Sequence, residues 1–272
     1  MNKIGMKGNS KVEIIVLIIF VLMCTTRQVT SQKLYKTTWK QSGIVIGGAA
    51  TMFGGAALVE SRRGAFTAQD ITLLRRETIF DRDQGTIDNF SDEAALYSDH
   101  FKNGILVAPL ALFLSGQARE NSKEIMMMYA EILALNGGLT SFTKGTFGKY
   151  RPYAYNPDVD LEFKLRPTTR RSFFSGHTSH VASLSFFTAT VFDDLYPDSN
   201  YKYLVWAGAV VAPAITGYLR VKAGQHFSTD TMVGYGVGAL IGYFIPELHK
   251  ITRDTGVNIV GAEGGLGLVY SF

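Results

Sequence analysis

The stretch MMMYAEILALNGGL (residues 126–139) places apolar side chains at the spacing of one face of an α-helix. Ile132, Leu135 and Leu139 are three, then four residues apart, which brings them to the same side of a helix. Further apolar stretches recur along the chain, and none shows the sustained alternation of a half-buried strand. The sequence therefore predicts an all-α fold, a helical bundle of about six core helices. The other five stretches are residues 43–58, 104–115, 181–192, 203–219 and 231–246.

The segments between and after these stretches are polar or rich in turn residues. Residues 61–100 are expected to form short helices and turns, and residues 150–172, with three prolines and many charges, a loop. In residues 257–272, VNIVGAEGGLGLVYSF, glycines stand between β-prone residues, which predicts a short C-terminal β-hairpin turning near residues 262–265.

The N-terminal segment has the pattern of an export signal. Lys3, Lys7 and Lys11 precede the short apolar run IIVLIIFVLMC, and a polar stretch follows it. Residues 1–31 are therefore expected to be a signal peptide or an N-terminal anchor, which indicates the cell envelope. The only cysteine, Cys24, lies here, so no intrachain disulfide can form. Three parts follow along the chain: 1–31, a helical domain over 32–250 and a tail over 251–272.

The composition leaves the relation to a membrane open. Charged residues make up 18% of the chain, below the roughly 25% of soluble domains, which favours a membrane or a large apolar core. The apolar stretches are mostly shorter than the roughly 20 residues of a membrane span, so a compact periplasmic domain is the alternative. The charge is mildly basic, +4, without runs of like charge, and no nucleic-acid partner is expected.

A first polar cluster, KGTFGKYRP (residues 144–152), holds Lys144 and Arg151. Lysine supplies a point charge and arginine a bidentate fork, a combination that matches a phosphate group. By itself the cluster is more typical of a basic loop beside a helix end than of a phosphate site.

A second cluster, SFFSGHTSHVAS (residues 172–183), opens an apolar stretch. The Ser175 hydroxyl, the Gly176 backbone and the free N–H groups of a helix start suit an anion, and His177 could protonate a leaving oxygen. The alternatives are a helix cap formed by Thr178 or Ser179, or a metal pair of His177 with His180. Without a clear third ligand the metal pair is disfavoured, and His180 is assigned a supporting role.

The third cluster, LRVKAGQHFSTD (residues 219–230), holds Arg220, His226 and Asp230. His226 and Asp230 are four residues apart, so on a helix the carboxylate can hold one imidazole N–H and leave the other nitrogen as a nucleophile. A solvated surface pair is the alternative, but it does not explain why all three clusters suit one phosphate.

Together the clusters resemble the type 2 phosphatidic acid phosphatase family, whose site architecture is shared with bacterial non-specific acid phosphatases and vanadium haloperoxidases. The family pattern is Lys, six residues, Arg-Pro; then Pro-Ser-Gly-His; then Ser-Arg, five residues, His, three residues, Asp. The resemblance covers roughly residues 100–250 and departs from the pattern twice, with Phe174 for the proline and Leu219 for the serine. These departures affect loop rigidity and one minor contact rather than the acid, the nucleophile or the charged ligands.

The resemblance implies a mechanism for this chain. His226, oriented by Asp230, would attack phosphorus and form a phosphohistidine, and His177 would protonate the leaving group. The phosphoryl oxygens would be held without any metal ion or other cofactor by the remaining motif residues, Lys144, Arg151, Ser175, Gly176 and Arg220.

The expected function is that of an envelope phosphatase acting on a lipid phosphate or diphosphate, such as phosphatidic acid, undecaprenyl diphosphate or a lipid A phosphate. It would be a phosphoric monoester hydrolase or a diphosphate hydrolase, in the membrane with its site facing the periplasm, or periplasmic. A soluble periplasmic acid phosphatase acting on small phosphomonoesters is the alternative. A vanadate-dependent haloperoxidase and a catalytically inactive envelope protein rank lower.

Overall fold

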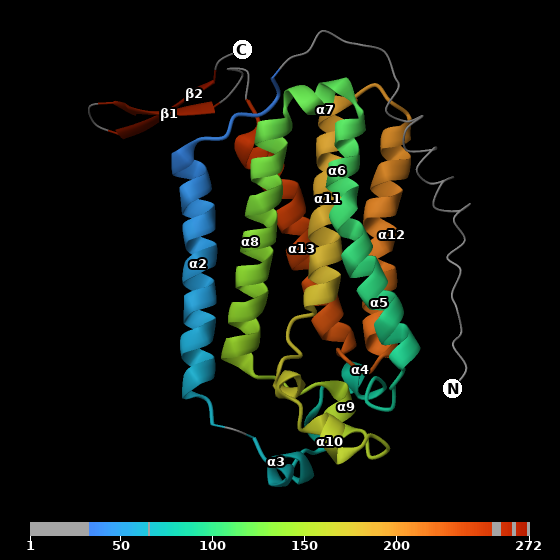
Figure 1. The fold of residues 1–272 in the computed structure, drawn as a ribbon. Coiled ribbons are helices and arrows are strands. Elements are labelled where there is room, and N and C mark those ends of the chain that lie inside the picture. The colour runs from blue at the N-terminus through green and yellow to red at the C-terminus, as the bar shows by residue number, and fades with distance from the viewer. Residues whose placement is uncertain (1–32, 65, 252–256, 263–264, 271–272) are drawn as a thin grey trace.

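A computed structural model describes residues 33–64, 66–251, 257–262 and 265–270, and it forms a helical bundle (Figure 1). The all-α prediction is confirmed, whereas the expected N-terminal signal segment lies outside the described residues. Five long helices form most of the bundle: α2 (Trp39–Arg62), α8 (Ser122–Phe147), α11 (Gly176–Leu195), α12 (Tyr201–Lys222) and α13 (Ser228–His249).

The sixth predicted helix is a broken column rather than one helix. Its parts are α5 (Asp92–Gly104), the 3-10 turn Ile105–Val107, α6 (Ala108–Ala111), the 3-10 turn Leu112–Leu114 and α7 (Gly116–Glu120). Pro109 stands in the first turn of α6, where its missing N–H is tolerated, and Ser115 caps α7 by accepting from the Ala118 N–H. The apolar stretch 104–115, which looked continuous, is therefore divided between α-helical and 3-10 turns.

Helix α11 lies at the centre of the bundle and is almost wholly buried. It packs against α13, α12 and α8, so its serines and threonines lie among apolar neighbours. Some of these hydroxyls donate to backbone carbonyls: Thr188 donates to Leu184 at 2.7 Å and Ser183 to His180 at 3.0 Å. The central helix thus holds the first turn, with Ser175 to His177, at a fixed place.

Helices α11 and α13 approach each other through glycines. In α13, Gly234, Gly238 and Gly242 are four residues apart, and a Cβ on Gly238 would lie 2.2 Å from a carbonyl oxygen of α11. Only glycine permits this distance, as in closely packed membrane helices. The three glycines face, in order, the carbonyl oxygens of Ser175, Ser179 and Ser183.

Three of the described helices are long and apolar enough to cross a membrane: α2, the helical segment Ser122–Tyr155 and α12. Their polar flanks lengthen the short apolar stretches of the sequence, so the doubt about span length is removed. Along α2, Ile44 is 67% exposed and Leu58 53%, as expected for side chains that face lipid rather than water. These observations identify a membrane protein.

Short helices cap one end of the bundle: α3 (Ala68–Thr72), α4 (Asp81–Gln84), α9 (Pro152–Tyr155) and α10 (Leu161–Lys164), with 3-10 turns at Arg76–Thr78 and Pro167–Arg170 (Figure 1). The expectation of an irregular loop over residues 150–172 was wrong. Pro152 and Pro167 each begin a single helical turn, because their fixed φ suits the first helical position. In the tail, β1 (Val257–Ala262) and β2 (Gly265–Tyr270) pair antiparallel, where the hairpin is expected.

Candidate active site

The residues predicted from the three clusters meet at the capped end of the bundle. Helix α8 ends there, α12 ends beside it, and α11 and α13 begin there (Figure 1). Segments more than 80 residues apart in sequence, such as the end of α8 and the start of α13, are joined by the ion pair of Lys149 with Asp230. The structure thereby brings together Lys144, Arg151, Ser175, Gly176, His177, Arg220, His226 and Asp230.

His226 lies in the turn between α12 and α13 and is fully buried. Among the described residues, neither of its ring nitrogens has a hydrogen-bond partner. Burial lowers its pKa well below the usual range, and the positive charges of Lys144, Arg151 and Arg220 lower it further. The imidazole is therefore held neutral, with free lone-pair capacity, beside three cations.

The Asp230 carboxylate forms hydrogen bonds with groups other than the His226 imidazole that the sequence suggests. Its Oδ2 lies 3.9 Å from His226 Nδ1, too far for a hydrogen bond. The carboxylate instead accepts from Lys149 Nζ at 2.8 Å, from Ser172 Oγ at 2.5 Å and from the Phe227 N–H at 3.1 Å. It holds the start of α13, and through it the loop that carries His226, rather than the imidazole itself.

Ser175 and Gly176 form the start of the central helix. Ser175 is the N-cap of α11 and accepts from the Thr178 N–H, so the cap lies earlier than the alternative at Thr178 or Ser179. A Cβ on Gly176 would lie 2.9 Å from the Thr140 side chain and 3.8 Å from Lys144 Nζ. Gly176 therefore lets the first N–H groups of α11 lie beside the Lys144 ammonium.

Lys144 and Arg151 are held by the backbone of one segment, the stretch that precedes α11. Lys144 Nζ donates to the Arg171 carbonyl at 3.1 Å, and Arg151 Nε donates to the Thr168 carbonyl at 2.9 Å. Arg151 also donates to Gln225 Oε1. Neither cation has a carboxylate partner among the ion pairs of the described residues, so their charges remain available to an anion.

Arg220 completes the group of cations from the end of α12. It is 5% exposed, and its Nη1 donates to Ser98 Oγ of α5 at 3.1 Å. The Nε of Arg220 is buried without a hydrogen-bond partner in the described part of the chain. Three cations and a helix start thus surround one buried imidazole, the arrangement that an oxyanion requires.

His177 has a partner that the sequence did not reveal. Its Nε2 lies 2.5 Å from Oδ1 of Asp99, in α5. Burial and the nearby Arg220 lower the pKa of His177 to about 3, and the Asp99 carboxylate opposes this shift. The negative charge of a bound phosphate would raise the same pKa. The His177 side chain is 22% exposed and that of Asp99 50%, so this pair is in contact with solvent.

The Asp99→Asn variant is expected to move the alkaline limb of the pH–kcat profile about one unit toward lower pH. A general acid must be protonated, so activity falls as pH rises through its pKa, and removing the Asp99 charge lowers that pKa. Phosphate release measured from pH 4 to 9 checks this. Glu93→Gln removes an exposed carboxylate from the same helix and should leave the profile in place; an unmoved limb in Asp99→Asn would separate Asp99 from proton transfer.

The remaining sequence expectations concern His180, Phe174 and Leu219. Within the described part of the chain, no group of three His, Cys, Asp or Glu side chains could hold a metal ion. Phe174 is buried and its ring meets Phe173 edge-on, whereas Leu219 is half-buried. The supporting role of His180 and the effect of the two departures stay predictions.

Several contacts of the site could not be read from the motifs. Asp99 and Ser98 come from α5, which carries none of the three clusters. Lys149 stands inside the first cluster, but nothing in its spacing distinguishes it from a solvated lysine. These residues gain their roles only when the bundle brings α5 and α8 against α11, α12 and α13.

Residues 125–253 match the family model of the PAP2 superfamily, which confirms the predicted resemblance. Two relatives come from Porphyromonas gingivalis. The lipid A 4'-phosphatase is 33% identical over 119 residues, which cover 42% of this chain and 46% of that protein. The lipid A 1-phosphatase is 35% identical over 130 residues, 46% of this chain and 24% of that protein. The chain thus spans less than half the length of these relatives.

One solved structure is also similar to this chain, and the match covers most of both chains. It is the first transmembrane PAP2 type phosphatidylglycerolphosphate phosphatase from Bacillus subtilis, with 16% sequence identity and a TM-score of 0.39. The match covers 86% of this chain and 92% of that one.

Proposed function

We propose that this protein hydrolyses a phosphate ester of a membrane lipid through a phosphohistidine intermediate on His226. The observation that carries the proposal is the buried imidazole of His226, which lacks a hydrogen-bond partner in the described structure and faces Lys144, Arg151 and Arg220. A tetrahedral oxyanion supplies the charge and the acceptor atoms that this site leaves unsatisfied.

In the first step, a ring nitrogen of His226 donates its lone pair to phosphorus while the bond from phosphorus to the lipid oxygen breaks. That oxygen takes a proton from His177, so the lipid leaves as an alcohol. The phosphoryl oxygens lie among the three cations, Ser175 and the Gly176 N–H, which stabilise the charge of the transition state. These cations do the charge work that magnesium does in many other phosphoryl-transfer sites.

In the second step, a water molecule attacks the same phosphorus and the bond from phosphorus to nitrogen breaks. His177, now neutral, accepts a proton from the water and regains the form that began the cycle. Inorganic phosphate leaves, and His226 returns to neutral imidazole. Asp230 contributes by fixing the start of α13, held in turn by Lys149 and Ser172.

A lipid substrate is supported by the helices that can cross a membrane and by the names of the relatives. The site lies at the end of α8 and α12, where the headgroups of a bilayer would lie if these helices cross it. Both Porphyromonas gingivalis relatives are named lipid A phosphatases. Among the expected lipids, a phosphorylated glycolipid of the lipid A type is therefore preferred over phosphatidic acid and undecaprenyl diphosphate.

Phosphate release from a panel of substrates in detergent, with a metal chelator present, tests the proposal. The purified protein is expected to hydrolyse a phosphorylated glycolipid faster than phosphatidic acid, undecaprenyl diphosphate or a soluble sugar phosphate. Turnover of soluble monoesters alone would instead indicate an acid phosphatase. Peroxide-dependent halide oxidation with vanadate, without phosphate release, would indicate a haloperoxidase, and no reaction at all an inactive protein.

We further propose that the site faces the periplasm. This orientation determines on which side of the membrane the N-terminal end of α2 lies. Helix α2 begins at the end of the bundle opposite to the site and ends beside it, at Arg62 (Figure 1). If α2 crosses the membrane, Trp39 and the site therefore face opposite sides. A periplasmic site then requires a cytoplasmic Trp39, which conflicts with export of this region by a cleaved signal.

Cysteine labelling of intact cells distinguishes the two orientations. In a Cys24→Ser background, Phe80→Cys at the site end is expected to react with a membrane-impermeant thiol reagent, and Trp39→Cys only after lysis. Both parent side chains are exposed, Phe80 by 66% and Trp39 by 87%, so access to the reagent depends on the side of the membrane. The reverse pattern would place the site in the cytoplasm and favour the export signal.

A further inference from the structure

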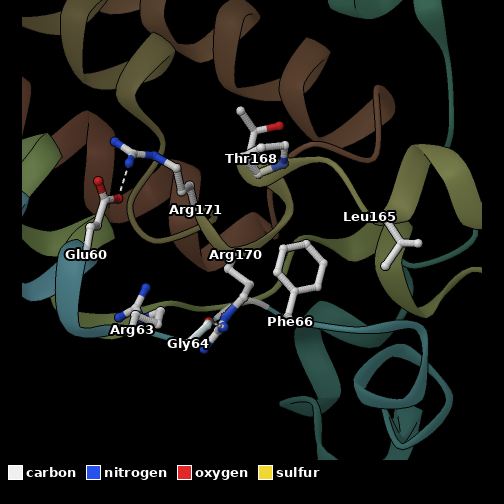
Figure 2. Close-up of a pocket in the computed structure, with 9 residues that line it drawn as sticks. Glu60, Arg63, Gly64, Phe66, Leu165, Thr168, Arg170 and Arg171 are labelled. Atoms are coloured by element: carbon white, nitrogen blue, oxygen red, sulfur yellow. Dashed lines mark hydrogen bonds and ion pairs between the residues drawn. The ribbon is translucent and has the colours of Figure 1, made fainter.

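A cavity of about 560 Å³ opens beside the proposed phosphate site (Figure 2). It lies between the end of α2 and the segment Pro167–Arg171, and no motif of the sequence pointed to it. We call it the basic pocket, after the lining residues that define it: Glu60, Arg63, Phe66, Thr168, Arg170 and Arg171.

The basic pocket carries more positive than negative charge. Its lining holds three arginines and a single carboxylate, Glu60, which pairs with Arg171 (Figure 2). Arg63 donates to the last carbonyls of α8, including Thr146 at 3.2 Å. Two arginine charges therefore have no carboxylate partner among the described residues that line the cavity.

Arg170, which lines the cavity, has hydrogen-bonding capacity that no described residue uses. Its Nη1 donates to the Gly64 carbonyl at 3.2 Å, and its guanidinium lies over the Phe66 ring at 5.8 Å. Its Nε is buried and, within the described structure, has no hydrogen-bond partner. A guanidinium with an unused N–H in a basic cavity matches the bidentate geometry of a phosphate or carboxylate.

The pocket and the proposed phosphate site share one wall. The carbonyls of Thr168 and Arg171 accept from Arg151 and Lys144 on the catalytic side, while the same segment lines the pocket. A substrate bound at the first site is therefore one backbone segment away from the second. The pocket also lies at the end of α2, a candidate membrane span, where lipid headgroups gather.

We propose that the basic pocket binds a second phosphate group on the headgroup of the lipid whose first phosphate is hydrolysed. The proposal rests on the proposed function and narrows its substrate class to lipids that carry two phosphates on one headgroup. Arg170 and Arg171 bind the second phosphate, and Glu60 releases Arg171 as that phosphate arrives. Because like charges repel, Glu60 weakens binding of the phosphate. In the empty pocket the same carboxylate pairs with Arg171.

Kinetics on a matched pair of glycolipids, one with two phosphates and one with a single phosphate, test the pocket. Arg170→Gln is expected to raise KM about tenfold for the bisphosphorylated lipid, the loss of one charge-assisted contact. KM and kcat for the monophosphorylated lipid should stay at the wild-type values, which also shows that the variants fold. Glu60→Gln should lower KM for the bisphosphorylated lipid, an effect of opposite sign.

Arg62→Gln provides the matched control, since Arg62 is an exposed arginine one residue before Arg63 and does not line the pocket. Equal effects of the pocket variants on both lipids, or none, would overturn the subsite while leaving phosphatase activity intact. If the wild type releases phosphate from neither lipid, the proposed function fails first. A soluble sugar bisphosphate that shows the same dependence on Arg170 would overturn the lipid headgroup as the source of the second phosphate.

Discussion

His226→Ala is expected to abolish phosphate release, by about 10⁴-fold or more, because no other group in the site can form the bond to phosphorus. His226 is fully buried beside three cations, and this burial lowers its pKa well below the usual range, which favours the neutral, nucleophilic imidazole. Single-turnover assays with a labelled lipid phosphate measure the loss. The wild type should retain label on the protein in an acid-labile, alkali-stable form, and the variant should not.

The exposed His100 offers the control for this variant. His100→Ala removes an imidazole that lies outside the site, and its turnover should equal that of the wild type. Thermal unfolding of both variants separates loss of chemistry from loss of fold. Comparable turnover in His226→Ala would exclude the covalent mechanism and leave direct attack by water.

Gly238→Ala is expected to destabilise the bundle by about 2–3 kcal/mol and to reduce activity at the same time. The added methyl group would lie 2.2 Å from the Ser179 carbonyl oxygen, so α13 must move away from α11. That movement carries the loop with His226 away from Ser175 and Gly176. Thermal unfolding in detergent and phosphate release measure the two effects.

The same helix provides the matched control. Gly236 has no atom of another residue within 4 Å of an added Cβ, so Gly236→Ala changes the same residue type without a clash. Because alanine favours a helix over glycine, this variant should be as stable as the wild type or slightly more stable. Equal losses in both variants would mean that helix propensity, rather than close packing, sets the stability here.

Much of the fold could be predicted from hydrophobic periodicity. Each apolar stretch became helical, since the pattern with which Ile132, Leu135 and Leu139 recur is a local property. The broken column through Pro109 and the short helices at Pro152 and Pro167 were harder, because a proline can begin a helical turn as well as end one.

The candidate site likewise has some residues that could be predicted from local sequence and others that could not. Residues with fixed spacing inside a motif, such as Ser175 and His177, could be predicted because their chemistry is visible over a few positions. Asp99 was not, because its role depends on α5 lying against the start of α11. The expected hydrogen bond from His226 to Asp230 also failed, because Lys149 and Ser172, which compete for that carboxylate, arrive from elsewhere in the fold.

The glycine contacts between α11 and α13 also affect how the geometry of the site responds to a change in bilayer thickness. Carbonyl oxygens and α-carbons fix the separation of these two helices, so no rotamer change can widen it. The helices α2 and α12 are long and apolar enough to cross a membrane, and helices that cross it can tilt as the bilayer thickens or thins. His177 and the turn with His226 would then move as one rigid unit, and the attacking nitrogen and the departing oxygen would keep their alignment in membranes of different composition.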